Sequence, residues 1–377
     1  MSREKTSTRR SAREQGSRSD PAVPAPAPPR AVAEPAGRRV VILTGPTGAG
    51  KSRLALDLAE RFAGEVVNAD SMQVYRFMDI GTAKPGPEDR ARVAHHLLDV
   101  VAPDEPYDAA RYAREAREAA EAILARGKTV FLVGGTGLYI RAFLGGLIDS
   151  GGADPEIRRR LEAEDAAARA AGDPDRLHRR LADLDPDAAR RIHPNDARRV
   201  VRALEICERT GRPASVWWRE HGFADRPYEV LHLALDPGPE VLDEITDRRC
   251  EAMIARGLLQ EARDLRDAGY GPELRPMRAI GYRHMQPVID GVETLRGALA
   301  EMQRDTRRFA RRQRTWLRKV PEAVFFDPRQ PARVEDAVAA FLAGEADSAA
   351  GRALGAPDPE YLGDPGNPDG RRLPSAG

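Results

Sequence analysis

The sequence of 377 residues lacks most features of secreted, metal-binding or membrane-embedded proteins. It contains only two cysteines, Cys207 and Cys250, which match no metal-ligand spacing and suit a reducing compartment. No apolar run approaches the roughly 20 residues that a membrane-spanning helix needs. The formal net charge is +1, so no global basic excess indicates a nucleic-acid partner. We therefore expect a cytoplasmic protein with no membrane partner, on which any polyanion would meet local basic patches.

Both ends of the chain lack apolar periodicity. Residues 1–37 are rich in Ser, Arg, Pro and Ala, and residues 345–377 are similar. Such segments bury too little apolar surface to fold, which predicts two disordered tails. Acidic residues in the first tail, and its missing apolar face, argue against a transit peptide.

One turn of the chain carries a complete phosphate-binding pattern. Residues 40–52 read VVILTGPTGAGKS and match G-x-x-x-x-G-K-[ST]. Successive backbone N–H groups of such a turn hold phosphate oxygens, and the dipole of the following helix adds to the attraction. Lys51 adds a positive charge, and the Ser52 hydroxyl suits a metal ion such as Mg²⁺. The expected phosphate-binding residues are Gly45, Pro46, Thr47, Gly48, Ala49, Gly50, Lys51 and Ser52.

Strand and helix patterns alternate around this loop. This alternation predicts an α/β fold, a P-loop core whose parallel sheet has right-handed crossovers. The predicted strands are 39–44, 65–71, 128–137, 228–236 and 323–327. The helices predicted between the first three strands are 51–62 and 109–127.

An insertion interrupts the core pattern at residues 150–213. It is dense in Arg, Asp, Glu and Ala and has no β-branched runs, which indicates several short helices in a small lobe. The core then comprises residues 38–149 and 214–344, with basic helices near its C-terminal end.

A kinase of the P-loop class also needs an acidic residue at the end of a hydrophobic strand to hold Mg²⁺. Gly134 and Gly135 occupy the expected position, and the neutral Thr136 follows them. The only carboxylate that we expect at a strand end is Asp70. We therefore interpret the loop as a site for a diphosphate that leaves, with Asp70 acting on the second substrate. A P-loop small-molecule kinase is the alternative.

Seven motifs occur in the order found in bacterial tRNA dimethylallyltransferases, the IPP transferase family, which the chain resembles over residues 40–327. They are GPTGAGKS (45–52), ADSMQVYRFMDIGTAKP (69–85), HHLLD (95–99), LVGGTGLYIRAFLGG (132–146), RIHPNDARRVVRALE (191–205), AIGYR (279–283) and RRQRTWLRK (311–319). The resemblance implies transfer of a dimethylallyl group from its diphosphate to N6 of the adenosine 3′-adjacent to the anticodon. It also implies that the helical insertion binds tRNA.

The resemblance implies catalytic roles for four residues. Asp70 is the general base for the N6 amine, and Thr136 lies where this amine meets Asp70. Lys51 and Arg249, with Mg²⁺, stabilise the departing diphosphate, and Arg248 is the alternative to Arg249. From the residues alone, Asp70 is equally well interpreted as the cap of a turn and Thr136 better as a turn hydroxyl.

The implied partners are the tRNA anticodon stem-loop and dimethylallyl diphosphate, and we expect a monomer. The residues implied to contact tRNA are Asp70, Ser71, Met72, Gln73, Thr136, Arg158, Arg198, Arg199, Val200, Val201, Arg202, Arg278, Gly281, Tyr282, Arg283, Arg307, Arg308 and Arg311. For the insertion arginines, an exposed ion-paired helix explains the residues equally well.

Residues 304–319, RDTRRFARRQRTWLRK, predict a basic helix. Met302, Phe309 and Trp316 recur every seven residues on a face that would dock on the core. Asp305 is the only acid among these basic residues, which disfavours a merely solvated face and favours contact with phosphate. The arginines that share the other face are Arg304, Arg307, Arg308, Arg311 and Arg318, with Arg314 at its edge.

Two further interpretations explain less of the sequence. A prenyltransferase for free adenine nucleotides has no need of the arginine-rich insertion or the basic helix. An RNA-binding module with a degenerate loop is disfavoured by the intact Gly50-Lys51-Ser52.

Overall fold

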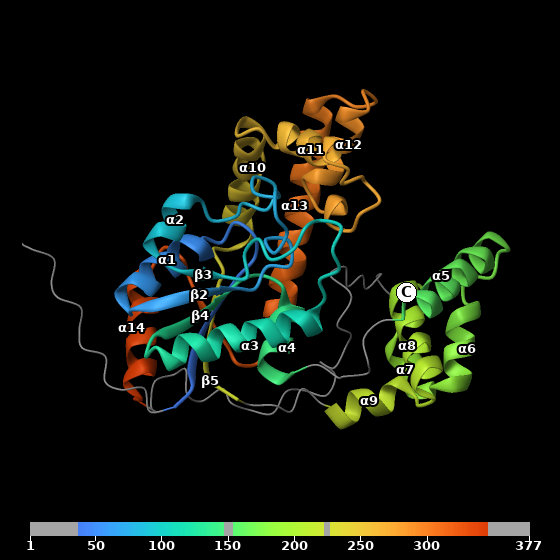
Figure 1. Ribbon diagram of the computed structural model, residues 1–377, viewed down its shortest axis with the longest axis horizontal. Coiled ribbons are helices and arrows are strands. Elements are labelled where there is room, and N and C mark those ends of the chain that lie inside the picture. The colour runs from blue at the N-terminus through green and yellow to red at the C-terminus, as the bar shows by residue number, and fades with distance from the viewer. Residues whose placement is uncertain (1–36, 147–153, 222–226, 346–377) are drawn as a thin grey trace, which may run out of the picture. The chain divides into compact units, whose positions relative to one another are not determined.

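The computed structural model describes residues 37–146, 154–221 and 227–345 (Figure 1). The two predicted tails lie outside the described residues, apart from one residue at the inner end of each. The core contains a six-stranded sheet in which every neighbouring pair is parallel, in the order β3-β2-β4-β1-β5-β6. The predicted α/β fold is confirmed. The strands are β1 Arg39–Thr44, β2 Gly64–Asn68, β3 His95–His96, β4 Thr129–Val133, β5 Glu229–Leu235 and β6 Ala323–Phe326.

Helices connect and cover these strands. Their bounds in the core are α1 Lys51–Arg61, α2 Pro87–Arg92, α3 Ala109–Ala125, α4 Gly137–Gly145, α10 Pro239–Ala255, α11 Leu258–Asp267, the 3₁₀ helix η1 Pro276–Arg278, α12 Tyr282–Ile289, α13 Leu295–Leu317 and α14 Pro331–Ala343. The predicted helices correspond to α1, α3 and the basic α13, whereas the two-residue strand β3 was not predicted. Figure 1 shows α10 to α13 grouped together, as their mutual contacts require.

The hydrophobic runs of the strands are buried on both faces of the sheet. In β1, Val40 and Ile42 pack into a cluster with α3, α4 and the α10–α13 group. Val41 and Leu43 point the other way and pack against α1 and α14. A parallel sheet covered on both sides requires apolar residues at every position, which is why the strands are continuous runs rather than alternating patterns.

The register of the sheet brings three turns to one edge. Val133 of β4 pairs with Leu43 on one side and with Asn68 on the other. The turns that follow β1, β2 and β4 therefore begin beside one another. These turns carry the phosphate loop, Asp70 and Thr136, and the carboxyl edge of a parallel sheet is where open α/β folds bind ligands.

Helix α13 packs on the core through a different line of residues from the predicted one. Met302 is buried, as expected, but the other buried positions are Ala298, Thr306, Ala310 and Leu317. The buried line thus steps mainly by four residues, as in an ordinary packed helix. Phe309 is only half-buried.

The described part of the insertion, residues 154–221, forms five helices with their own hydrophobic cluster. Ala214 and Trp217 of the last helix belong to this cluster, and the Ser215 N–H donates to the buried Asp185 at 2.7 Å. The helical lobe therefore extends beyond residue 213, where the sequence pattern placed its end. Its helices are α5 Pro155–Ala170, α6 Arg176–Leu184, α7 Pro186–Arg191, α8 Ala197–Thr210 and α9 Ala214–His221.

Within the described ranges, no helix combines the length and the apolar composition that crossing a bilayer requires.

Candidate active site

The phosphate loop connects β1 to α1 and closes around its own lysine. Lys51 Nζ donates to the carbonyl oxygens of Gly45 and Pro46, both at 2.8 Å. Gly48 and Gly50 have φ of 85°, a left-handed conformation that only glycine adopts without strain. The hydrogen bonds of Lys51 therefore hold its side chain against the backbone of the loop.

Asp70 lies in the turn after β2. Its Oδ1 accepts the Met72 N–H at 2.8 Å, and its own N–H donates to Asn68 Oδ1 at 3.1 Å. Asp70 therefore does cap a turn, as the competing interpretation held. Its second oxygen, Oδ2, receives no hydrogen bond within the described residues and can accept one from a substrate.

Thr136 meets the Asp70 turn directly. The Ser71 N–H donates to Thr136 Oγ1 at 3.0 Å, and the Thr136 N–H donates to the Ala69 carbonyl at 3.1 Å. A Cβ on Gly134 would overlap the Ala69 backbone, so a residue with a side chain does not fit where the metal-binding acid was expected. The missing acid is thus a consequence of the close approach of two turns.

Arg249 of α10 lies close enough to Lys51 for its charge to influence the lysine. Burial, and to a smaller extent the charge of Arg249, lower the pKa of Lys51 to about 8, although the charge of Asp70 acts in the opposite direction. Burial also lowers the pKa of Arg249, again against the influence of Asp70. Arg249 forms no hydrogen bond or ion pair with a carboxylate in the described part of the chain. Neither Lys51 nor Arg249 forms an ion pair with a carboxylate in the described ranges, and two neighbouring cations of this kind favour the binding of an anion.

Arg248 differs from its neighbour. It is exposed and pairs with Glu244 on the same helix. Of the two candidates for the diphosphate-binding arginine, the geometry therefore supports Arg249.

The hydroxyl of Ser52 is the side-chain oxygen that the phosphate loop is predicted to offer Mg²⁺. The Ser52 hydroxyl is exposed and has no hydrogen-bond partner in the described ranges. Those ranges contain no group of three or more His, Cys, Asp or Glu side chains that could hold a metal. A single protein oxygen fits Mg²⁺, which keeps several waters and binds mainly through substrate phosphates.

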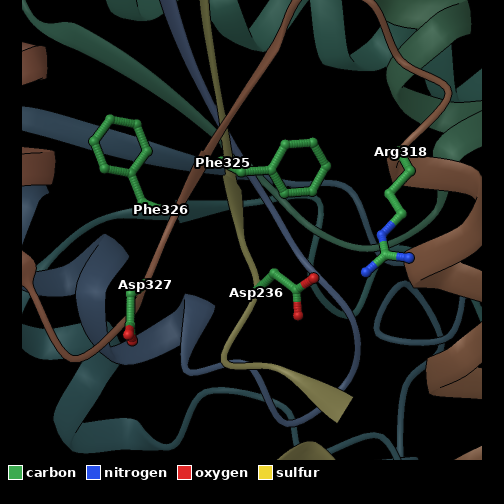
Figure 2. A pocket seen from close by; sticks show the side chains of 5 residues that line it. All are labelled: Asp236, Arg318, Phe325, Phe326 and Asp327. Atoms are coloured by element: carbon green, nitrogen blue, oxygen red, sulfur yellow. The ribbon is translucent and has the colours of Figure 1, made fainter.

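The expectation that Asp70 is the only carboxylate at a strand end is wrong, because Asp236 follows β5 and Asp327 follows β6. Asp236 is the one beside β1. Both its oxygens accept hydrogen bonds from the Arg314 guanidinium at 2.8–3.0 Å. Beside it is a pocket of about 360 Å³, shown in Figure 2. No residue predicted for catalysis lines this pocket, whose lining residues are Asp236, Arg318, Phe325, Phe326 and Asp327.

Residues 71–73 lie partly buried on the Asp70 turn. The Gln73 amide donates to the carbonyls of Thr82 and Ala83 at 3.1 and 3.3 Å, and Met72 packs against the core. Their predicted contact with tRNA remains a prediction.

The AIGYR motif has a supporting role that sequence reasoning missed. Tyr282 is fully buried, and its hydroxyl donates to Glu261 at 2.6 Å. The same carboxylate accepts the N–H groups of Asp79, Ile80 and Gly81 at 2.7–3.1 Å. The predicted tRNA contact through the Tyr282 side chain is therefore wrong, because that side chain anchors the 79–81 turn.

The other residues of this region that were predicted to contact tRNA differ in how exposed they are. Gly281 is buried, and its predicted contact with tRNA remains a prediction. Arg278 and Arg283 are exposed, and Arg283 pairs with Asp305 at 2.6 Å.

The insertion arginines are held by carboxylates. Arg158 donates twice to Glu205, and Arg202 pairs with the same carboxylate at 3.0 Å. Glu205 is fully buried. Arg199 pairs with Asp196 at 3.2 Å, while Arg198 is exposed.

Val200 and Val201 of α8 were predicted to contact tRNA, but their side chains are buried. They are only 2% and 4% exposed, within the hydrophobic cluster of the lobe. Their side chains stabilise the lobe and do not reach its surface.

The arginines of α13 have acidic partners that do not lie in the basic segment. Arg307 pairs with Asp247, and Arg311 pairs with Asp243, both carboxylates of α10. The inference drawn from the single acid Asp305 was therefore incomplete. Arg308 is the most exposed of the three predicted contacts on α13, at 62%, with Asp305 as a distant partner at 3.7 Å.

Known proteins share this arrangement. The family model described as IPP transferase matches residues 73–320. The chain belongs to this family. It is 48% identical over 308 residues to the tRNA dimethylallyltransferase of Desulfatibacillum aliphaticivorans, a match that covers 82% of this chain and 99% of that protein. It is 51% identical to tRNA dimethylallyltransferase 2 of Geotalea uraniireducens, covering 74% and 89%.

Two solved structures resemble the chain in fold and sequence. The full-length tRNA isopentenylpyrophosphate transferase of Bacillus halodurans has a TM-score of 0.60 and 36% identity, covering 82% of this chain and 98% of that one. A eukaryotic dimethylallyltransferase described as acting on tRNA has a TM-score of 0.71 and 30% identity, covering 81% and 80%.

Proposed function

We propose that this protein transfers a dimethylallyl group from dimethylallyl diphosphate to N6 of the adenosine 3′-adjacent to the anticodon in tRNA. The observation that carries the proposal is the proximity of Lys51, Arg249 and Asp70 at the phosphate loop. The two cations suit a departing diphosphate, and the carboxylate suits the second substrate. The dimethylallyltransferase names of the relatives support the same donor and acceptor.

In the proposed reaction the allylic C–O bond breaks as the bond from N6 to carbon forms. The diphosphate leaves with the electron pair of the broken bond, and the loop amides, Lys51 and Arg249 stabilise its charge. The exocyclic amine is a weak nucleophile and must lose a proton. Asp70 accepts that proton through Oδ2, and general-base assistance of this kind contributes about 10²–10⁴-fold in rate.

Mg²⁺ is the proposed cofactor, held by Ser52 and by oxygens of the diphosphate. It would supply further neutralisation of charge on the leaving group. Thr136 orients the Asp70 turn through its hydrogen bond to the Ser71 N–H.

The tRNA is proposed to meet exposed arginines of both the lobe and the core. The best supported are Arg198, Arg278 and Arg308, which are exposed. The target adenosine must leave its stack in the anticodon loop before its amine can reach Asp70.

A small-molecule kinase is less well supported. Asp236 is the carboxylate placed at a strand end beside β1, but Arg314 occupies both its oxygens. It is therefore not a free ligand for the metal that nucleotide phosphates require.

Mass spectrometry of tRNA nucleosides tests the proposed function. Incubation with dimethylallyl diphosphate should add one dimethylallyl group to an adenosine of the anticodon loop. Transfer of phosphate from ATP to a small molecule, with unmodified tRNA, would contradict it.

The enzyme is proposed to act as a monomer in the cytoplasm, where its two buried free thiols stay reduced. Light scattering with and without tRNA checks the oligomeric state.

A further inference from the structure

One side chain of the basic helix α13 reaches the predicted chemistry directly. Gln313 Oε1 accepts the Thr47 N–H of the phosphate loop at 2.8 Å. Gln313 Nε2 donates to the Gly135 carbonyl at 3.2 Å. A single neutral amide therefore connects the loop after β1 with the turn after β4, which carries Thr136.

Gly135 leaves space for this amide. A Cβ at Gly135 would lie 2.6 Å from Gln313 Nε2, closer than real Cβ contacts occur. Gly135 is not among the residues with positive φ, so its backbone conformation does not itself require glycine. The second glycine of the GGTG motif is thus explained by the position of Gln313.

The rest of α13 holds Gln313 in place. Arg311 pairs with Asp243 of α10, the helix that also carries Arg249. Arg314, which directly follows Gln313 in the chain, donates hydrogen bonds to the Asp236 carboxylate at the end of β5. Helix α13 is thus anchored on both sides of the amide.

We propose that Gln313 is a positioning residue for diphosphate binding. By accepting the Thr47 N–H and holding the Gly135 carbonyl, it fixes the phosphate loop relative to the Thr136 turn before substrate arrives. This proposal rests on the proposed function, because it takes the anion of the loop to be the diphosphate. An amide suits the role since it accepts on one side and donates on the other.

Gln313→Ala in the full-length chain tests the proposal. Two neutral hydrogen bonds are lost, so the Kd for inorganic diphosphate with Mg²⁺ and the KM for dimethylallyl diphosphate should both rise about tenfold. Single turnover at saturating donor should stay within about threefold of wild type, because a positioning residue acts on binding. Gln313→Glu should weaken binding more, because it removes the donor and places a negative charge beside the diphosphate.

Gly135→Ala tests the same contact from the other side. Its new methyl group displaces the flexible end of Gln313 while leaving that residue present. The variant should reproduce the weaker diphosphate binding, and the double variant Gly135→Ala/Gln313→Ala should be no worse than either single one. Gln303→Ala is the matched control. It removes the same side chain from the same helix, where the amide contacts Asp247 and Glu251, and should bind diphosphate as wild type does.

Two results would overturn the proposal. Wild-type diphosphate affinity in Gln313→Ala, with only a lower melting temperature, would reduce Gln313 to a packing residue. Effects of Gly135→Ala and Gln313→Ala that multiply in the double variant would show that they act separately. Failure of the proposed function looks different, because the wild-type protein would then leave tRNA unmodified, whatever the diphosphate affinities of the variants.

Discussion

Cationic side chains of the core site and of the inserted lobe are held in opposite ways. In the core, the charge of Arg249 acts on Lys51, and no carboxylate in the described ranges pairs with Arg249. In the lobe, Arg158 and Arg202 converge on the fully buried Glu205. Cations that lie near one another destabilise the free protein and are relieved by an anionic ligand. Cations around a buried carboxylate already have their counter-ion and stabilise the fold.

The first prediction neutralises Asp70, the acid whose charge acts on both Lys51 and Arg249. Asp70→Asn keeps the shape of the side chain but cannot accept the proton from N6. Turnover should fall by about 10²–10⁴-fold, while the Kd for diphosphate changes little. Single-turnover kinetics at saturating tRNA measure the effect. Asp104→Asn, at an exposed loop position, is the control. Near-normal turnover would leave Asp70 with its turn-capping role alone.

The second prediction removes the acid of the lobe. Glu205→Ala leaves Arg158 and Arg202 without their shared counter-ion, and breaking a buried ion pair costs about 3–5 kcal/mol of stability. We expect a loss near the lower limit, because both arginines are partly exposed and can turn to water. Urea denaturation measures it. Glu220→Ala, which breaks the exposed pair with Arg212, should cost less than about 1 kcal/mol. Equal losses in the two variants would contradict the comparison.

The third prediction separates two adjacent arginines. Arg249→Ala should weaken diphosphate binding by about 10–10²-fold, the range for a lost hydrogen bond to a charged group. Arg248→Ala is the matched control and should bind as wild type does, because Arg248 is exposed and pairs with Glu244. Calorimetric titration with diphosphate measures both. A larger effect in Arg248→Ala would exchange their roles.

The fourth prediction is a pH dependence. Because burial lowers the pKa of Lys51 to about 8, free enzyme loses this charge as the pH rises through 8. If the charged form binds diphosphate, affinity should fall about tenfold for each pH unit above 8. Lys51→Arg should flatten the profile above pH 8.

The stability of the free protein should change in the opposite direction. Between pH 8 and the unfolded pKa of about 10.5, the unfolded chain binds more protons than the folded one, so the Lys51 contribution to the free energy of unfolding rises with pH. Diphosphate affinity that is constant from pH 7 to pH 9.5 would contradict the role of Lys51.

The fold and the phosphate loop could be predicted because their signals are local. The loop pattern at residues 45–52 specifies a turn, and continuous apolar runs specify strands buried on both faces. The proximity of Asp70 and Thr136 was implied only by the family resemblance. The structure produces it because the two residues follow the paired strands β2 and β4. The contacts of Gln313 were missed because its partners are distant in the sequence: Gly135 is 178 positions away and Thr47 is 266 positions away.

The partners of the basic helix could not be predicted for the same reason. Counting acids within 304–319 finds only Asp305, whereas Asp243 and Asp247 come from α10 through helix packing. Val200 and Val201 were misassigned because family motifs mix surface arginines with the buried residues that hold them. Exposure distinguishes the two groups, and it depends on the tertiary structure.

The last and smallest expected effect concerns the exposed arginines of α13. Arg308→Ala should weaken binding of all substrate tRNAs alike and reduce the slope of log affinity against log salt by about one unit. Arg307→Ala should change that slope less, because Arg307 already has Asp247 as a counter-ion. Filter binding between low and moderate salt measures both slopes.

The stability of the same two variants distinguishes a phosphate contact from a structural pair. Arg307→Ala leaves Asp247 without its partner and should lower the melting temperature, whereas Arg308→Ala should not. If Arg307→Ala instead gives the larger loss of slope with an unchanged melting temperature, tRNA phosphate must displace Asp247 on binding. The ion pairs of α13 would then resemble the core site, where cations await an anionic ligand, and the contrast with Glu205 would be limited to the lobe.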